Sequence, residues 1–159
     1  MLGNMTKDQG SSTQRLEVNE CWTLLRSVSV GRLAVWVEDH PDIFPVNYAV
    51  DHGTVVFRTG AGTKLSAALA DHPVAFEVDG VDQSTGVAWS VNLKGAAELL
   101  TSTEELVESF SLMLFPWESG HKDAFVRITP ASTTGRRFTI SEPTEWWTVN
   151  SRAPHASDE

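Results

Sequence analysis

The chain has 159 residues, of which 41% are hydrophobic and 21% charged, and its formal net charge is −9 at neutral pH. This length is enough for one compact domain, and a domain of this size needs neither disulfides nor a structural metal for stability. The acidic balance argues against a nucleic-acid-binding protein, because contact with a phosphate backbone requires a basic surface.

The compartment can be predicted from the cysteine content and the apolar runs. Cys21 is the single cysteine, so the chain cannot form an intrachain disulfide. The first residues lack the apolar stretch of a signal peptide. Apolar runs such as Leu33–Val37 are far shorter than the roughly twenty residues that cross a bilayer. We therefore expect a cytoplasmic protein that does not enter a membrane.

Both ends of the chain have the composition of tails. Residues 1–15 are rich in Gly, Ser, Thr, Gln and charged residues and show no periodicity, so they cannot bury enough apolar surface to repay their ordering entropy. Residues 149–159 have a similar composition. The sequence therefore predicts a disordered tail over 1–15, one folded domain over 16–148 and a C-terminal tail over 149–159.

The domain begins with a helix and continues with strands. A helix is predicted over Val18–Ser27, because Cys21, Leu24, Leu25 and Val28 recur at helical spacing. Segments rich in β-branched and aromatic residues then predict strands over Val30–Val37, Ile43–Val50, Thr54–Thr59, Val74–Val78 and Val87–Leu100.

Turn and helix signals separate these strands. The composition of Asp51–Gly53 predicts a hairpin turn. A short helix is expected over Lys64–Ala70, and another over Thr103–Leu114, where Ser102 and Glu105 have capping-box spacing. Because most strands follow one another without an intervening helix, we expect a small antiparallel barrel rather than a doubly wound parallel sheet. The last strands are predicted over Ala124–Ile128 and Thr134–Ile140.

The segment from Phe57 to Lys64 has the pattern of an anion site. A strand ends there in a loop of small residues, and a helix follows whose first turn carries Lys64. Free backbone N–H groups, the hydroxyls of Thr59 and Thr63 and the charges of Arg58 and Lys64 could together hold a phosphate monoester. The alternative is a glycine-rich turn with solvated charges.

Two strand segments could line a ligand groove. A polar strand face is either exposed to solvent, which is the commoner outcome, or lines a groove. Pro45 leaves the same alternatives for Phe44–Tyr48, since proline confines a strand to an edge or a bulge. In the strand over Val87–Leu100, alternation separates a core face from a polar face: Trp89, Val91 and Leu93 against Ser90, Asn92 and Lys94.

In this order the segments resemble the pyridoxamine 5′-phosphate oxidase-like family of flavin-binding split β-barrels. The resemblance extends from about Val18 to Ile140 and rests on an ordered set of short motifs. These are Val30–Ala34, Pro45–Tyr48, Phe57–Thr59 with Lys64, Val74–Asp79, Gly86–Val91 with Gly95, Val126–Pro130 and Gly135–Phe138.

The resemblance implies a mainly β fold, an antiparallel split β-barrel, and a homodimer whose two cofactor sites lie at the subunit interface. It implies FMN as the cofactor, with a deazaflavin coenzyme as the alternative. A flavin requires an anion clamp at one end and an apolar wall with backbone hydrogen bonds at its ring. The cofactor-binding residues that the resemblance implies are Arg58, Thr59 and Lys64 at the phosphate, Val46, Asn47 and Tyr48 along the isoalloxazine and ribityl portion, and Trp89 and Ser90 from the later strand.

Other chemistry has less support in the sequence. The five histidines show no metal-ligand spacing with one another or with Cys21, so no metal site is expected. No catalytic residue can be assigned. Oxidation of vitamin B6 is not expected, because the basic residues available for a substrate phosphate reduce to Arg136 and Arg137, which could equally pair with surface carboxylates.

Three functional hypotheses follow. The first is an FMN- or deazaflavin-dependent oxidoreductase acting on a small organic substrate, in which the cofactor carries the electron transfer. The second is a binding module without turnover, such as a flavin or haem carrier or sensor. The third is a dimeric barrel whose cofactor site has decayed. The sequence does not identify the substrate.

Overall fold

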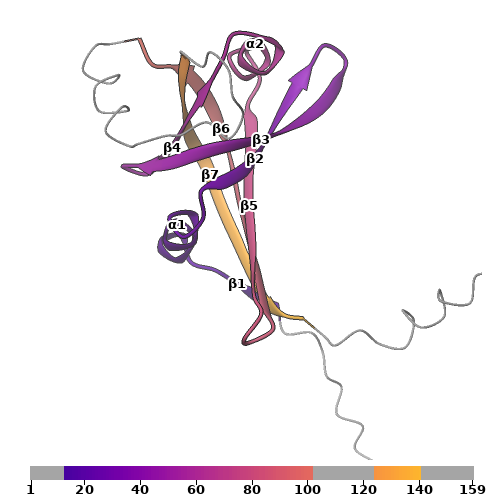
Figure 1. Ribbon diagram of the computed structural model, residues 1–159, viewed down its shortest axis with the longest axis vertical. Helices are drawn as coiled ribbons and strands as arrows, with labels where there is room; N and C mark the ends of the chain where they lie inside the picture. Colours follow the sequence, from indigo (N-terminus) through magenta and orange to yellow (C-terminus); the bar gives the residue numbers. More distant parts are fainter. Residues whose placement is uncertain (1–12, 102–123, 141–159) are drawn as a thin grey trace, which may run out of the picture.

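The computed structural model describes residues 13–101 and 124–140 (Figure 1). The helix predicted over Thr103–Leu114 lies outside these residues. The elements in chain order are β1 (Gln14–Arg15), α1 (Val18–Leu25), β2 (Val30–Val37), β3 (His40–Asp51), β4 (Thr54–Thr59), α2 (Thr63–Ala68), β5 (Val74–Asp82), β6 (Val87–Leu99) and β7 (Ala124–Thr139).

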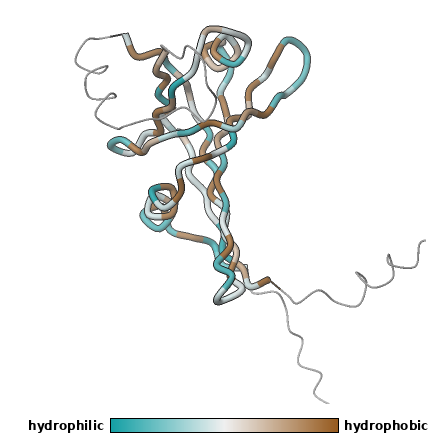
Figure 2. The backbone as a smooth tube through the Cα atoms, viewed as in Figure 1, coloured by the Kyte–Doolittle hydropathy of each residue, from teal (hydrophilic) through white to brown (hydrophobic). Residues whose placement is uncertain are grey.

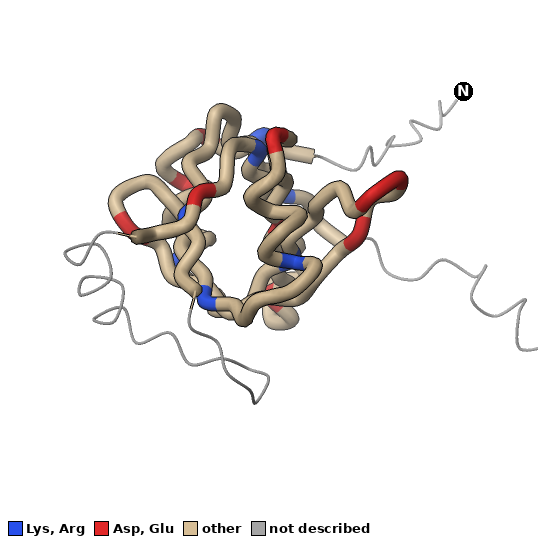
Figure 3. Tube along the Cα trace, turned by 90° about the horizontal axis from the view of Figure 1, so that it is seen from above, with Lys and Arg blue, Asp and Glu red and all other residues tan. Residues whose placement is uncertain are grey.

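The strands form a closed antiparallel ring. Their order is β1-β7-β4-β3-β2-β5-β6, and the further pairing of β6 with β7 closes the ring, to which β1 adds beside β7. Seen from above, the trace runs around this ring (Figure 3). The predicted antiparallel split β-barrel is confirmed.

The two helices attach at different places. In Figure 1, α2 lies at the upper end of the barrel, whereas α1 lies beside the lower part of the long strands. A glycine in β7 permits the close approach of α1. A Cβ added at Gly135 would lie 2.6 Å from Cys21 Sγ and 3.0 Å from Leu16 Cδ1. The helix could not pack at this distance on a larger residue.

The predicted hairpin at Asp51–Gly53 is confirmed. Asp51 pairs with Thr54, so His52 and Gly53 form a two-residue turn between β3 and β4. His52 has a φ of 45° and Gly53 a φ of 74°. Positive φ at both central positions is the signature of the turn type that matches the twist of paired strands.

The barrel interior is filled by apolar side chains from the strands of the ring. Leu33, Phe57, Phe76 and Leu93 have no exposed surface. Figure 2 shows hydrophobic stretches along the strands and hydrophilic colour at several of the turns. Burial of this kind supplies the main stabilisation of a domain this size.

The last strand differs from the prediction of two short strands. β7 is one continuous strand that pairs with β6 from Val126 to Thr139. A register shift opposite Lys94 and Gly95 forms a bulge, and Pro130 lies there, opposite Gly95. The prediction was wrong because a bulge accommodates the missing N–H of proline without ending the strand.

Several boundaries lie a few residues from their predicted places. β3 begins at His40, because a turn at Glu38 and Asp39 lets Val37 pair directly with His40. α1 ends at Leu25 and α2 at Ala68, earlier than expected. β5 continues to Asp82, and β1 forms in the last residues of the segment expected as a tail.

Candidate functional site

The end of β4 and the start of α2 carry the two cations of the predicted phosphate site. Arg58 is the penultimate residue of β4, and its guanidinium lies over the Phe125 ring, 5.6 Å from the ring centroid. Lys64 is in the first turn of α2, and its ammonium lies over the Phe44 ring at 5.3 Å. One cation therefore stands at each end of the loop 60–62, and a ring holds each of them by a cation–π contact.

The backbone of this loop depends on glycine. Gly62 has a φ of 150° and a ψ of −168°, a combination that is essentially restricted to glycine. A Cβ there would meet no atom within 4 Å, so the requirement lies in the backbone and not in the space around it. Thr59 is 3% exposed, and its hydroxyl donates a hydrogen bond to the Gly60 carbonyl oxygen at 3.3 Å. Thr59 thus ties the end of β4 to the loop.

The predicted residues of β3 divide between its two faces. Val46 and Tyr48 are each 5% exposed and belong to the barrel core. The Tyr48 hydroxyl donates a hydrogen bond to the Leu25 carbonyl oxygen at 2.5 Å, and burial raises the pKa of Tyr48. Because Tyr48 pairs with Phe57 and both face the core, alternation places Asn47 and Arg58 on the outer face of their strands. The side chain of Asn47 is therefore the one of these three that lies outside the barrel.

The outer face beside Arg58 has an apolar patch with a second arginine. Arg127 forms an ion pair with Asp51, with 2.9 Å between Nη2 and Oδ2, and both side chains are mostly buried. In the described part of the chain, the Arg127 Nε is buried without a hydrogen-bond partner. The buried members of the patch are Val56, Leu100 and Phe125.

Trp89 and Ser90 lie elsewhere, on the long strands β5, β6 and β7. They line a hollow of about 540 Å³, to which no residue of β3, β4 or α2 contributes. Cross-strand pairing arranges its lining in rows. One row is polar and consists of Asp79, Ser90 and Arg136; the next is apolar and consists of Val81, Ala88 and Phe138.

The alternation predicted along β6 is confirmed. Val91 and Leu93 are buried in the core, and Trp89 packs against it, while Lys94 on the other face is exposed. The Trp89 ring also covers Gly80 on β5, where a Cβ would lie 2.6 Å from the ring. Glycine at this position lets the indole lie directly on the neighbouring strand.

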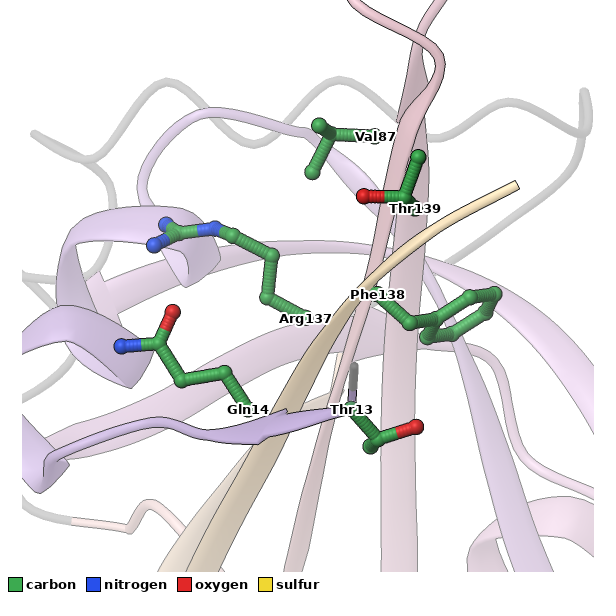
Figure 4. Close-up of a pocket in the computed structure, with 6 residues that line it drawn as sticks. All are labelled: Thr13, Gln14, Val87, Arg137, Phe138 and Thr139. Atoms are coloured by element: carbon green, nitrogen blue, oxygen red, sulfur yellow. The ribbon is translucent and has the colours of Figure 1, made fainter. Parts of the chain in front are cut away.

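A smaller hollow of about 300 Å³ lies on the other side of β7. Figure 4 shows Gln14 and Arg137 together on that side, while Phe138 points the opposite way. Arg137 also approaches Glu20 of α1, with 3.6 Å between Nη1 and Oε1. Arg136 and Arg137, which are adjacent in β7, therefore lie on opposite faces of the strand, since strand side chains alternate.

The rings beneath the two cations were not identified from the sequence. Phe125 lies opposite Arg58 in the register of β4 with β7, two strands that are far apart along the chain. Phe44 and Lys64 likewise come from different elements, β3 and α2. No local pattern could have revealed either contact, because each depends on the closed barrel.

The described residues contain neither a cluster of potential metal ligands nor a helix that could cross a membrane. Within 13–101 and 124–140, no three His, Cys, Asp or Glu side chains gather as a metal site would require. In the same residues, no helix has the length and apolar character to span a bilayer.

Comparison with known proteins agrees with the geometry. The family model described as pyridoxamine 5′-phosphate oxidase matches residues 17–137. A Corynebacterium glutamicum structure, provisionally assigned to pyridoxamine 5′-phosphate oxidase, is 41% identical, with 82% of this chain and 96% of that chain covered and a TM-score of 0.73. The FAD-binding protein of Mycobacterium smegmatis is 38% identical, with 80% and 99% covered and a TM-score of 0.69.

A relative without assigned function shows the same extent of likeness. The uncharacterised protein Rv0080 of Mycobacterium tuberculosis is 34% identical over 134 residues, which are 81% of this chain and 88% of the relative. The family match extends from the start of α1 to residue 137 of β7 and includes the β4–α2 loop and most residues of the larger hollow. The chain therefore belongs to the pyridoxamine 5′-phosphate oxidase family.

Proposed function

We propose that the protein binds a flavin, with FMN as its cofactor, and acts in the cytoplasm as an oxidoreductase on a small organic substrate. The observation that carries this proposal is the pair of cations at the two ends of one loop, Arg58 and Lys64, each placed over an aromatic ring. The likeness to the Mycobacterium smegmatis FAD-binding protein supports a flavin as the ligand.

The residues of the β4–α2 junction fit the phosphate of a flavin. A phosphate monoester is largely dianionic at neutral pH, and charge-assisted hydrogen bonds from Arg and Lys are the strongest that a protein offers it. Arg58 and Lys64 would hold the phosphate, and Thr59 would keep the loop in place through its bond to Gly60. Asn47, on the outer face like Arg58, would bind the ribityl portion, and the backbone of Val46 and Tyr48 would run along the ring.

Three flavin-type ligands share this phosphate. FMN carries it as a monoester, FAD carries it within a pyrophosphate, and a deazaflavin coenzyme carries it at the equivalent position of its side chain. We favour FMN because two cations match a dianionic monoester best. The other two are the alternatives that a direct comparison of affinities has to separate.

We further propose that two subunits share each cofactor site. The hollow that contains Trp89 and Ser90 includes no residue of β3, β4 or α2. In a homodimer, Trp89 and Ser90 of the partner subunit would complete the site that begins at Arg58 and Lys64. The Ser90 hydroxyl and the apolar side chains on the same face of the hollow would supply the apolar wall with a few polar groups that such sites contain.

A bound flavin would supply hydride transfer, and the protein would supply position and electrostatics. Arg58 and Lys64 would fix the phosphate end, so that the ring is held at one place relative to the substrate. The outer face of β3 and β4 would exclude water from one side of the ring. This division of labour does not require a dedicated acid or base in the protein.

The test is reconstitution followed by reduction. Purified protein incubated with FMN and desalted should retain the absorbance bands of a flavin, lose them when a reduced nicotinamide is added without oxygen, and regain them with a small organic acceptor. Retention without reduction or turnover would indicate a flavin carrier or sensor. A Soret band in the purified protein would indicate haem, and the absence of any retained cofactor would overturn the proposal.

A further inference from the structure

The hollow on β5, β6 and β7 combines exposed apolar side chains with a row of polar ones. Several of the apolar side chains that line it are exposed to solvent: Val81 is 55% exposed, Phe138 36% and Ile140 44%. A volume of about 540 Å³ lies within the range of small-molecule sites. Large apolar side chains that line a hollow and remain exposed are a common mark of a ligand site.

The two charged residues of its polar row differ in their ion-pair partners. The Asp79 carboxylate is held by the Arg32 guanidinium at 2.6 Å, and the same guanidinium binds Glu77 at 2.7 Å. Within residues 13–101 and 124–140, none of the ion pairs involves Arg136 at the other end of the row. Among the described residues, the Arg136 guanidinium therefore has no ion-pair partner, and it lies beside an apolar wall.

We infer that this hollow binds a planar apolar anion, such as an aromatic carboxylate, and that this is the class of substrate on which the proposed flavin site acts. The apolar body of the ligand lies against Val81, Ala88 and Phe138. Its anionic group faces Arg136 and the Ser90 hydroxyl, which is directly opposite Arg136 in the register of β6 with β7. Guanidinium groups bind carboxylates with two parallel hydrogen bonds, so the head group fixes the orientation of the ring.

The second half of this inference rests on the proposed function. Trp89 and Ser90 belong both to the hollow and to the cofactor site proposed above, so a ligand in the hollow lies next to the place proposed for the flavin ring. The hollow itself, with its apolar wall and its cation, does not depend on a flavin being bound.

The experiment is a calorimetric titration of the cofactor-free protein with 2-naphthoate and with its neutral analogue 2-naphthylmethanol. Naphthoate should bind the wild type, and Arg136→Gln should weaken it by about tenfold or more, because a hydrogen bond to a charged group is typically worth about 1.5–3 kcal/mol. The matched control is Arg137→Gln, which alters the next residue of the same strand on the opposite face and should leave the affinity unchanged. The neutral analogue should bind weakly, and neither arginine substitution should change its affinity. Phe138→Ser should lower the affinity for both ligands.

The outcomes separate the two proposals. The proposed ligand class is wrong if naphthoate binds Arg136→Gln as tightly as it binds the wild type. It is also wrong if Arg137→Gln lowers the affinity for naphthoate as much as Arg136→Gln does. Naphthoate that splits a dimer into monomers shows that the partner subunit fills this hollow and leaves no room for a ligand, which also overturns it. In FMN-loaded protein, naphthoate should shift the flavin absorbance, and an unchanged spectrum overturns the substrate assignment. If FMN does not bind but the affinity for naphthoate depends on Arg136, the proposed function is wrong and the proposed ligand class is supported.

Discussion

Tyr48 links the barrel core to α1 through one side chain. Its ring meets Phe76 edge to face with centroids 4.9 Å apart, and its hydroxyl donates to the Leu25 carbonyl oxygen. Burial removes the phenol from water, which disfavours the charged form and raises the pKa of Tyr48. The phenol therefore remains protonated in the folded protein at a pH where it would ionise in the unfolded chain.

This gives a prediction with a defined sign. Since the folded pKa of Tyr48 lies above the unfolded value of about 10, its contribution to stability is complete below that pH and is lost as the pH rises above it. Tyr48 is the single tyrosine, so tyrosinate absorbance reports on it alone. We expect the absorbance change to coincide with loss of circular dichroism during alkaline titration. Ionisation well before unfolding would show that the phenol is not buried. Tyr48→Phe is the control, because it contains no tyrosine and should show no tyrosinate signal.

At the scale of the elements, the contact of α1 with β7 can be tested through its thiol. Cys21 is fully buried, and desolvation, with a smaller effect from Glu20, raises its pKa. A buried thiol with a raised pKa has little thiolate at neutral pH and reacts slowly. We predict that Cys21 is inert to a disulfide reagent in the native protein, and that Gly135→Ala makes it react many times faster by displacing α1.

The control for this prediction is Gly53→Ala, since Gly53 has positive φ and lies in the β3–β4 turn, where an added Cβ would meet no atom within 4 Å. It should lower the melting temperature without exposing the thiol selectively. Rapid reaction of wild-type Cys21, or equal acceleration in both variants, would be inconsistent with the packing of α1 on Gly135.

The elements show which features a sequence reveals. The turn at Asp51–Gly53 could be predicted because its signal is local, and the alternation of β6 could be predicted because a strand repeats every two residues. β7 was predicted as two strands, and its continuity could not be predicted from local signals, because the pairing with β6 that carries it past Pro130 is not local. The site shows the same limit. Arg58 and Lys64 were found from their loop, but Phe44 and Phe125 beneath them become neighbours only in the closed barrel.

At the scale of the whole molecule, the proposed dimer with shared sites predicts complementation. One variant carries Arg58→Ala with Lys64→Ala, and the other carries Ser90→Trp, which fills the hollow. Each homodimer has two damaged sites and should retain little flavin. After unfolding and refolding together, a mixed dimer contains one intact site, formed by the loop of one subunit and the hollow of the other.

The mixture should therefore regain flavin binding that neither variant shows alone. No recovery in a mixture that contains mixed dimers would mean that each site lies within one subunit. A monomeric mass at micromolar concentration would remove the basis for sharing, because a site built from two copies could not exist.

The central claim is that Arg58 and Lys64 hold the phosphate of the flavin, and a titration of FMN, FAD and riboflavin against wild type, Arg58→Ala and Lys64→Ala tests it most directly. Since a hydrogen bond to a charged group is worth about 1.5–3 kcal/mol, each substitution should weaken FMN by roughly ten- to a hundredfold. FAD should weaken in the same direction, and riboflavin, which lacks the phosphate, should change little. If both variants bind FMN and riboflavin as the wild type does, the phosphate does not lie at the β4–α2 loop and the account is wrong.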